Sequence, residues 1–352
     1  MKKKVAVAMS GGVDSSLCAA LLQEQGYEVL GITMRLSDDS REMNGVSSAA
    51  TDARRVADFL GIEHVVADFR TLFSDKVVDY FLTEYLTART PNPCVICNRF
   101  LKFGELFSFA REKGADFLAT GHYVRVEKEK DGSFALKKGR DEKKDQSYVL
   151  YRLPREILSH ILFPLGSYRK EETRALAQKL SLPVANKAES QEICFVPEDD
   201  YKAYLSQHRP NRFHAGDIID MQGKILGQHR GLPFYTIGQR KGLGIAAAHP
   251  LYVIALDEAN NRVIVGKNEE LYASSLFASD VNWLMEEPTQ EISVHAKIRY
   301  GSREVQANVL PLKDRAVKVS FLEPQRAVTP GQSVVFYSGE RLVGGATIES
   351  RT

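Results

Sequence analysis

Residues 10–16 have the composition and spacing of a loop that binds nucleotide phosphates. The segment is Ser10-Gly11-Gly12-Val13-Asp14-Ser15-Ser16, and it follows directly on the apolar run Val5-Ala6-Val7-Ala8-Met9. This order predicts a buried parallel strand, a tight turn and a helix, whose unpaired N–H groups and dipole attract phosphate oxygens. The serine hydroxyls add donors, and Asp14 is a candidate ligand for the Mg²⁺ that accompanies ATP. The segment therefore predicts chemistry on ATP.

The exact pattern of this loop narrows that chemistry. It lacks the Gly-x-x-x-x-Gly-Lys-Ser/Thr motif of kinases and GTPases and the Gly-x-Gly-x-x-Gly motif of dinucleotide-binding proteins. Ser-Gly-Gly-x-Asp-Ser instead resembles the PP-loop of ATP pyrophosphatases, which cleave ATP between the α and β phosphates and pass AMP to a substrate oxygen. The alternative, an ordinary strand-to-helix turn, is disfavoured because seven residues match in the expected structural context.

Two cysteines lie in settings that favour sulfur chemistry. Cys97 ends the rigid turn Thr90-Pro91-Asn92-Pro93-Cys94-Val95-Ile96-Cys97 and precedes a predicted helix, so we expect the helix dipole to stabilise its thiolate. Cys194 lies far along the chain in the polar stretch 189–195. Two separated reactive thiols indicate a sulfur relay. Cys18, among alanines and leucines of the first helix, is predicted to be a buried core residue.

Other uses of the cysteines are weaker. A structural zinc site is disfavoured because the sequence offers no second cysteine pair with suitable spacing. A thioredoxin-like redox pair is disfavoured because the Cys-x-x-Cys motif lies beside a nucleotide loop. An iron–sulfur cluster held by Cys94, Cys97 and Cys194, with one iron open, stays an alternative.

The composition is typical of an intracellular enzyme. The chain has 352 residues, of which 43% are hydrophobic, enough for two or three domains with packed cores. Lys2-Lys3-Lys4 runs straight into a strand rather than a signal peptide, and no apolar run reaches the length of a membrane span. Four unevenly spaced cysteines indicate a reducing compartment, so we expect a cytoplasmic protein that does not bind membranes.

The net charge is only +2, so any nucleic-acid surface must come from local clusters of basic residues. One candidate is the run 137–144, which carries five basic and two acidic residues. The alternative interpretation is that this run forms a solvated hairpin tip and does not bind nucleic acid. A second candidate is the group Arg230, Arg240 and Lys241 in a glycine-rich stretch.

The elements that must position these residues begin with an α/β pattern. Strands are predicted at 5–9, 27–34, 64–67 and 117–119. After the first helix, further helices are predicted at 48–60, 69–86 and 102–113. This alternation predicts a parallel sheet with helices on both faces, whose strands end together around the ligand.

Later segments differ in character. Residues 124–150 are predicted to be a hairpin insertion, and residues 157–180 have helical spacing. We expect an α/β PP-loop catalytic domain at 1–205, a small central β-rich domain at 206–273, and a C-terminal β-barrel at 274–352.

Several motifs together resemble those of bacterial tRNA-specific 2-thiouridylases, which place sulfur on C2 of the wobble uridine of certain tRNAs. The matching segments are 9–15, 90–93, 119–123, 144–148, 190–195 and 235–240. The resemblance covers nearly the whole chain. These motifs together are specific to the family, whereas the phosphate loop alone identifies only the PP-loop superfamily.

The resemblance implies a role for each matching residue. ATP would be bound by Ala8, Met9, Ser10, Gly11, Gly12, Val13, Asp14, Ser15, Met34 and Gly121. The pocket for the flipped uridine would be lined by Asn92, Pro93 and Cys94. Further contacts with tRNA, and hence with its anticodon loop, would come from Lys144, Asp145, Gln146, Arg299 and Tyr300.

The resemblance also implies a reaction sequence. The C2 oxygen would first be adenylated, with release of pyrophosphate. Cys194 would then carry sulfur as a persulfide supplied by an upstream sulfur donor. Cys97 would be the nucleophile that frees this sulfur and ends in a transient disulfide with Cys194. At position 94 the family commonly has Asp, so Cys94 replaces a carboxylate proposed as acid or base and strengthens the cluster alternative.

Three rival functions stay open at this point. A tRNA lysine-adding ligase shares the phosphate loop but needs no cysteine pair. A 4-thiouridine synthase also uses a persulfide, but its loop usually follows an RNA-binding domain, whereas here the loop starts at residue 10. A non-catalytic RNA-binding protein is the third, and the intact Asp14 and the two thiols argue against it.

Overall fold

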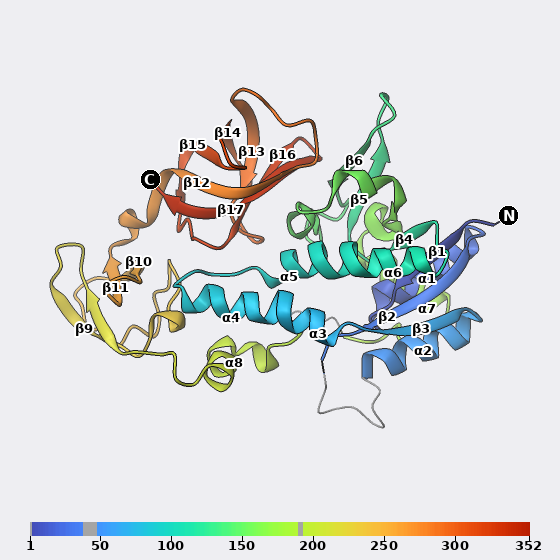
Figure 1. Cartoon of the computed structure of the whole chain (residues 1–352), viewed down its shortest axis with the longest axis horizontal. Helices are drawn as coiled ribbons and strands as arrows, with labels where there is room; N and C mark the ends of the chain where they lie inside the picture. The colour runs from blue at the N-terminus through green and yellow to red at the C-terminus, as the bar shows by residue number, and fades with distance from the viewer. Residues whose placement is uncertain (1, 38–47, 189–192) are drawn as a thin grey trace.

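The computed structural model describes residues 2–37, 48–188 and 193–352. Within these residues, a five-stranded parallel sheet forms the centre of the N-terminal part (Figure 1). Its strands lie in the order β3-β2-β1-β4-β7, with bounds β1 Lys4–Ala8, β2 Glu28–Arg35, β3 Glu63–Asp68, β4 Phe117–Ala119 and β7 Ile161–Leu162. The apolar run of β1 lies in the middle of the sheet and is buried, as a strand covered on both faces requires. The predicted parallel α/β sheet is confirmed.

Helices pack on this sheet. The first three are α1 Val13–Glu24, α2 Ser48–Leu60 and α7 Lys170–Lys179. A longer helical run joins α3 Arg70–Phe73, the π-helical segment η1 Ser74–Val78 and α4 Asp79–Leu86. A second run joins α5 Pro93–Ile96, the π-helical segment η2 Cys97–Glu105 and α6 Leu106–Glu112. The two runs lie alongside each other (Figure 1), and η1 and η2 contact one another.

The second helical run begins at Pro93 rather than near Lys102, so the predicted start was wrong. Proline lacks an N–H and has a fixed φ, which suits the first position of a helix rather than its interior. The side chain of Asn92 caps the run by accepting a hydrogen bond from the Val95 N–H at 3.4 Å. The Thr-Pro-Asn-Pro turn therefore starts the helix that carries Cys94 and Cys97.

Residues 157–180 do not form one helix, which corrects the sequence prediction. The segment contains the end of the 3₁₀ turn η4 Arg155–His160, strand β7, the 3₁₀ turn η5 Pro164–Ser167 and helix α7. Pro164 cannot continue a helix, and β7 pairs in parallel with β4 at the edge of the sheet. A Cβ added at Gly166 would lie 1.8 Å from the carbonyl oxygen of Val124, so only glycine fits where η5 packs against the start of β5.

A small four-stranded sheet follows helix α8 Tyr201–His208. Its order is β10-β11-β8-β9, with bounds β8 Gly216–Ile219, β9 Ile225–His229, β10 Tyr252–Asp257 and β11 Arg262–Gly266. The 3₁₀ turn η7 Leu232–Phe234 lies between β9 and β10, whereas η6 Pro197–Asp199 precedes α8 and η8 Asn268–Leu271 follows β11. This is the β-rich central part that the turn signals predicted.

The C-terminal strands close into a barrel through pairing of β12 with β17. Their bounds are β12 Tyr272–Trp283, β13 Ile292–Lys297, β14 Val305–Pro311, β15 Val317–Arg326, β16 Ser333–Ser338 and β17 Arg341–Arg351. The predicted hairpin is present as β5 Val124–Lys128 and β6 Phe134–Lys138, and β6 pairs with β17 at Lys137 and Arg341. The hairpin therefore extends the sheet of the C-terminal barrel, although its residues belong to the N-terminal part of the sequence (Figure 1).

Among the helices that the structure describes, none is both long enough and apolar enough to span a bilayer.

Candidate active site

The phosphate loop lies between the end of β1 and the start of α1, as predicted. Gly12 precedes the helix and gives it no side-chain cap, so no side chain of the N-cap residue competes for the first N–H groups of α1. Gly11 has φ +68°, and a Cβ there would lie 2.5 Å from the Ala49 carbonyl oxygen. Only glycine fits at this position. The loop therefore has the backbone shape and open helix start of an anion site.

The predicted adenine and phosphate contacts share one edge of the sheet. Strand β1 lies between β2 and β4, so Ala8, Met34 and the residues after Ala119 lie side by side. A Cβ at Gly121 would lie 2.9 Å from the Ser15 nitrogen and 3.0 Å from the Asp14 Cβ. Glycine at 121 thus allows the segment after β4 to pack directly on the phosphate loop.

Asp14 is held in an ion pair. The Lys170 ammonium lies 2.7 and 2.8 Å from its two carboxylate oxygens, and the Tyr123 hydroxyl donates to one of them at 2.8 Å. Lys170 is only 8% exposed. Within the described residues, no group of three or more His, Cys, Asp or Glu side chains is arranged to hold a metal ion. Lys170 was missed in the sequence because no local motif contains it.

All four cysteines lie within the described residues and are free thiols. Cys18 is fully buried in α1, and burial raises the pKa of its thiol far above its usual value, which fits the predicted core role. Cys94 and Cys194 are exposed, whereas Cys97 is buried. Within the described residues, Cys94, Cys97 and Cys194 are not arranged as a group that could hold a metal ion, so the geometry adds no support to the iron–sulfur alternative.

The expected activation of Cys97 by a helix dipole is wrong. Cys97 lies one turn inside the helical run that begins at Pro93, not at its start. Desolvation by the surrounding protein raises the pKa of its thiol, and the neighbouring Cys94 raises it further. Lys102 acts in the opposite direction and lowers this pKa. The counter-charge for a Cys97 thiolate is therefore a side chain rather than a dipole.

Cys194 lies close to this pair of cysteines. Its neighbour Phe195 packs edge-on against Phe73 and Phe81, with ring centroids 5.5 and 5.2 Å apart, and Phe195 also joins the apolar cluster that contains Cys97. The pKa of Cys194 is raised to about 12, mainly by desolvation and then by Cys97 and Cys94. Three thiols thus lie within electrostatic range of one another. Residues 190–192 of the predicted motif lie outside the described residues.

The side chain of Lys102 connects the thiols to the nucleotide end of the sheet. It lowers the pKa values of Cys94, Cys97 and Cys194, and it also lowers that of His122. His122 follows Gly121, the residue that packs on the phosphate loop. Lys102 could not be connected with Cys97 from the sequence, because a spacing of five places two residues about 140° apart on an α-helix.

Two predicted tRNA-contacting residues meet beside Cys94. The Tyr300 hydroxyl, from the C-terminal barrel, donates to the Asp145 carbonyl oxygen at 3.1 Å. Desolvation raises the pKa of Tyr300, and Asp145 and Cys94 raise it further, which places all three together. Tyr300 is 45% exposed, so an aromatic face remains accessible next to the thiol. Gln146 is used internally, since its side-chain oxygen accepts the Tyr123 N–H at 3.0 Å.

Hydrogen bonds join loop 90–93 to the barrel. The Gln332 side chain donates to the carbonyl oxygens of Thr90 and Pro91 at 3.0 and 3.2 Å, and the Thr90 N–H donates to Pro330. The backbone positions of Asn92 and Pro93 therefore depend on the barrel as well as on the helix that they start.

Arg299 faces inward rather than toward an RNA surface. One of its terminal nitrogens donates to Ile237, Ala327 and Thr329 at 3.2, 2.9 and 2.6 Å. Burial lowers the pKa of its guanidinium. The structure thus places Arg299 between the central part and the barrel.

The basic run 137–144 is largely ion-paired. Lys137 lies 2.7 and 3.1 Å from Glu127 and Glu129, Lys138 lies 2.7 Å from Glu304, and Arg140 lies 3.4 Å from Glu172. These pairs favour a structural role for much of the run.

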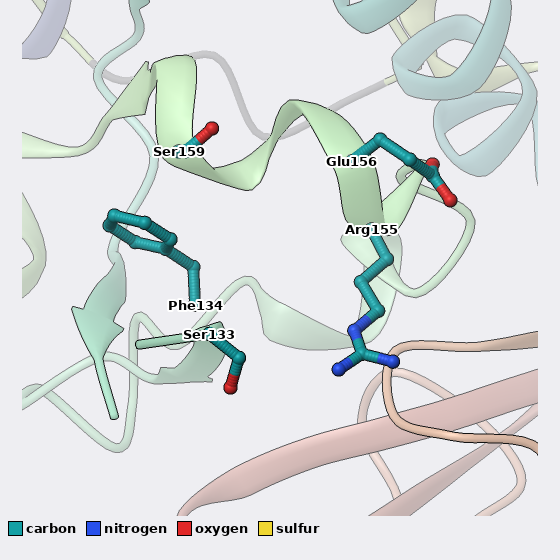
Figure 2. Close-up of a pocket in the computed structure, with 5 residues that line it drawn as sticks. All are labelled: Ser133, Phe134, Arg155, Glu156 and Ser159. Carbon is teal, nitrogen blue, oxygen red and sulfur yellow. The ribbon is translucent and has the colours of Figure 1, made fainter. Parts of the chain in front are cut away.

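A separate surface pocket opens beside the hairpin. Figure 2 shows the residues that line it, which come from the hairpin turn and from η4: Ser133, Phe134, Arg155, Glu156 and Ser159. The pocket contains none of the thiols and none of the phosphate-loop residues, so it is not part of the candidate active site.

Comparisons with known proteins follow the same three-part division. Family models match residues 3–198 as a tRNA methyl transferase HUP domain, 202–267 as a tRNA methyl transferase PRC-barrel domain, and 273–348 as an aminomethyltransferase beta-barrel domain. The chain is 52% identical to the tRNA-specific 2-thiouridylase MnmA 1 of Caldanaerobacter subterraneus subsp. tengcongensis, covering 100% of this chain and 99% of that protein. It is 51% identical to the tRNA-specific 2-thiouridylase MnmA of Carboxydothermus hydrogenoformans, covering 99% and 98%. The chain belongs to the family of tRNA-specific 2-thiouridylases.

Proposed function

We propose that this protein uses ATP to place sulfur on C2 of the wobble uridine of tRNA. The observation that carries the proposal is the continuity of one site. The charge of Lys102 lowers the pKa values of three thiols and of His122. His122 follows Gly121, which packs against Asp14 and Ser15 of the phosphate loop. A uridine beside Cys94 would therefore lie between a nucleotide site and a sulfur site, and both are needed for thiolation.

The first step is adenylation of the base. The C2 oxygen of the flipped uridine attacks the α phosphate of ATP and displaces pyrophosphate, so that C2 then carries AMP as a leaving group. The ATP site comprises Ala8, Met9, Ser10, Gly11, Gly12, Val13, Asp14, Ser15, Met34 and Gly121. Asp14 would hold Mg²⁺ only after giving up part of its contact with Lys170, since both of its oxygens face that ammonium.

The second step transfers sulfur. The terminal sulfur of a Cys194 persulfide bonds to C2, and the Cys97 thiolate then attacks the Cys194 sulfur. The sulfur–sulfur bond of the persulfide breaks, a Cys97–Cys194 disulfide forms, and AMP leaves with the former C–O electron pair. The two thiols are oxidised as the transferred sulfur is reduced, and cellular thiols reset the pair. An exposed Cys194 suits loading by an external sulfur donor.

The tRNA would bind across the N-terminal part and the barrel. Asn92, Pro93 and Cys94 line the uridine pocket, and Tyr300 offers an exposed aromatic ring beside it. Lys144, Asp145 and Gln146 shape the neighbouring loop, and Arg299 supports this surface from within through its three internal contacts. We place the domain boundaries near residues 205 and 273 and the protein in the cytoplasm, where tRNA and reduced thiols are available.

Mass-spectrometric nucleoside analysis tests the proposal. Unmodified tRNA is incubated with the protein, Mg-ATP and a persulfide-generating desulfurase, and the uridine products are identified. We expect 2-thiouridine with the wild type, none without ATP, and none with Cys97→Ala or Cys194→Ala. Cys18→Ala, the same change at a buried thiol, should retain activity. ATP-dependent product that survives both active-site substitutions, or a methylated uridine instead, would contradict the proposal.

A further inference from the structure

Two carbonyl oxygens of the phosphate loop are held by donors from the protein. The Gly12 oxygen accepts the Ser16 hydroxyl at 2.8 Å, and the Gly11 oxygen accepts the Lys187 ammonium at 3.0 Å. Carbonyl oxygens carry partial negative charge and repel an anion, whereas backbone N–H groups attract it. A loop that binds phosphate therefore needs its carbonyl oxygens turned away from the ligand. Ser16 is part of the helix that follows the loop, but Lys187 lies far along the chain.

Lys187 comes from a segment that packs beside the loop. Segment 182–187 follows α7, and its Val184 lies in the apolar cluster that β1, α1 and α2 form. The Lys187 N–H donates to the Val184 carbonyl oxygen at 2.9 Å, which fixes the backbone from which the side chain extends. The ammonium also lies 2.6 Å from the Asp52 carboxylate of α2. One side chain therefore joins the phosphate loop, α2 and the segment after α7.

The bond to Lys187 determines how the Gly11–Gly12 peptide faces. This peptide is trans, so the Gly11 carbonyl oxygen and the Gly12 N–H point in opposite directions. With the oxygen held by Lys187, the Gly12 N–H faces away from the lysine. Among residues 2–37, 48–188 and 193–352, this N–H has no acceptor, so it is free to bind a ligand. Two consecutive glycines restrain a peptide weakly, and rotation of this one would exchange the N–H for an oxygen.

We propose that Lys187 is a positioning residue for adenylation: it holds the Gly11–Gly12 peptide in the orientation that presents the Gly12 N–H to the phosphates of ATP. The inference rests on the proposed use of ATP by this loop, but not on the sulfur relay. Asp52 supports the role because it holds the ammonium beside the Gly11 oxygen. Gly11 itself packs against α2, where an added Cβ would lie 3.0 Å from the Asp52 Cβ.

Arg55 provides a matched control for the charge of Lys187. Its guanidinium lies 3.5 Å from the second carboxylate oxygen of Asp52, and its side chain is 61% exposed. Lys187 and Arg55 thus pair with the same carboxylate, and Lys187 in addition donates to the phosphate loop. Arg55→Met removes a positive charge from this ion pair and leaves the bond to Gly11 in place.

Calorimetric titration of the full-length protein measures the effect on nucleotide binding. The ligands are α,β-methylene-ATP with Mg²⁺, which resists cleavage between the α and β phosphates, and adenosine, which has no phosphate. We expect Lys187→Met to weaken binding of the ATP analogue about tenfold, because a hydrogen bond to a charged ligand is lost. Adenosine affinity should not change. Lys187→Arg should restore most of the affinity for the analogue, and Arg55→Met should resemble the wild type.

Amide hydrogen exchange followed by mass spectrometry examines the loop itself, before nucleotide is added. Peptides that cover residues 9–16 should exchange faster in Lys187→Met than in the wild type or in Arg55→Met. Peptides from the C-terminal barrel report on general unfolding and should exchange at the same rate in all variants. The Lys187 side chain is 41% exposed, so we expect its loss to leave the rest of the fold intact.

Several results would contradict the role of Lys187. Lys187→Met that binds the ATP analogue as tightly as the wild type, or that loses adenosine affinity in the same proportion, would overturn it. Unchanged exchange of the loop peptides would also overturn it, since a charge that acts only through space would leave the loop as it was. Wild-type protein that does not bind the analogue would defeat both this inference and the proposed function. A selective loss in Lys187→Met, with a wild type that makes no 2-thiouridine, would defeat the proposed function alone.

Discussion

Lys170 of α7 places its ammonium 2.7 and 2.8 Å from the two carboxylate oxygens of Asp14, which lies 156 residues earlier in the phosphate loop. Tyr123 completes the arrangement by donating to Asp14 and hydrogen-bonding with Thr173, each at 2.8 Å. A buried positive charge from α7 therefore lies against the acidic residue of the phosphate loop. Helix α7 and the segment after β4 are both fastened to the nucleotide site through this one carboxylate.

Removing the Lys170 charge should weaken the fold. Lys170→Met leaves Asp14, whose side chain is 32% exposed, without its ion-pair partner. We expect the free energy of unfolding to fall by about 2 kcal/mol, below the 3–5 kcal/mol that is typical of fully buried pairs. Urea denaturation followed by circular dichroism measures it. Tyr123→Phe removes only one neutral donor and should cost about 1 kcal/mol, and an equal loss in both variants would contradict this ranking.

Asp280 joins the barrel to the helix of the thiol site. Its carboxylate lies 3.0 Å from Arg99, 2.8 Å from Arg152 and 2.9 Å from Arg315. Asp280→Asn should lower the free energy of unfolding by about 2–3 kcal/mol, because the Arg152 side chain is 8% exposed and would lose its counter-ion. Thermal unfolding measures the change.

Arg315→Ala is the matched control for that variant. The Arg315 side chain is 58% exposed, and surface ion pairs contribute about 0–1 kcal/mol. The prediction fails if this variant is destabilised as much as Asp280→Asn.

The substitution Cys94→Asp should make Cys97 harder to ionise. The Cys94 group already raises the pKa of Cys97, and a full carboxylate charge in its place opposes a second anion more strongly. We expect the pH of half-maximal Cys97 alkylation to increase. Cys94→Asn is the neutral control of similar shape, and a Cys97 profile that is the same in both variants would show that charge at position 94 has no effect.

His122 should make the protein less stable in acid. Its pKa in the folded state lies well below the usual 6.5, mainly because it is buried and also because Lys102 is near. Below pH 6.5 the unfolded chain binds a proton that the folded chain does not, so stability is lost as the pH falls. The loss should approach about 1.4 kcal/mol per pH unit. Unfolding free energies of wild type and His122→Gln between pH 7 and pH 5 test this, and equal slopes would exclude the effect.

The sequence predicted correctly those parts of the structure that depend on residues close together in the chain. The apolar run of β1, the glycine turn and α1 are consecutive in the chain, so their strand, loop and helix followed from the order of these residues. The start of α5 was missed because Pro93 was treated as a helix breaker, whereas the Asn92 cap makes it the first helical residue. Cys97 and Cys194 were singled out by their local settings, a rigid turn before a predicted helix and a polar stretch, and the family motifs then implied the role of each.

The missed features depend on partners that are distant in sequence or on an altered helical period. Lys170 meets Asp14 only after the whole sheet has formed, so no window of sequence contains the pair. Lys102 joins Cys97 through π-helical spacing, whereas a search at 3.6 residues per turn places it on another face. The inward direction of Arg299 follows from contacts with two other parts of the chain.

The pairing of β6 with β17 has a consequence for synthesis. Lys137 leaves the ribosome long before its partner Arg341, so the outer edge of the hairpin has no strand to pair with while the rest of the chain is being made. An unpaired strand edge is prone to wrong pairing with other chains. The Glu127, Glu129, Lys137 and Lys138 side chains put charges of both signs on this hairpin, and such charges oppose the stacking of one nascent hairpin on another. Translation of the last strand therefore completes the N-terminal part of the molecule as well as the barrel.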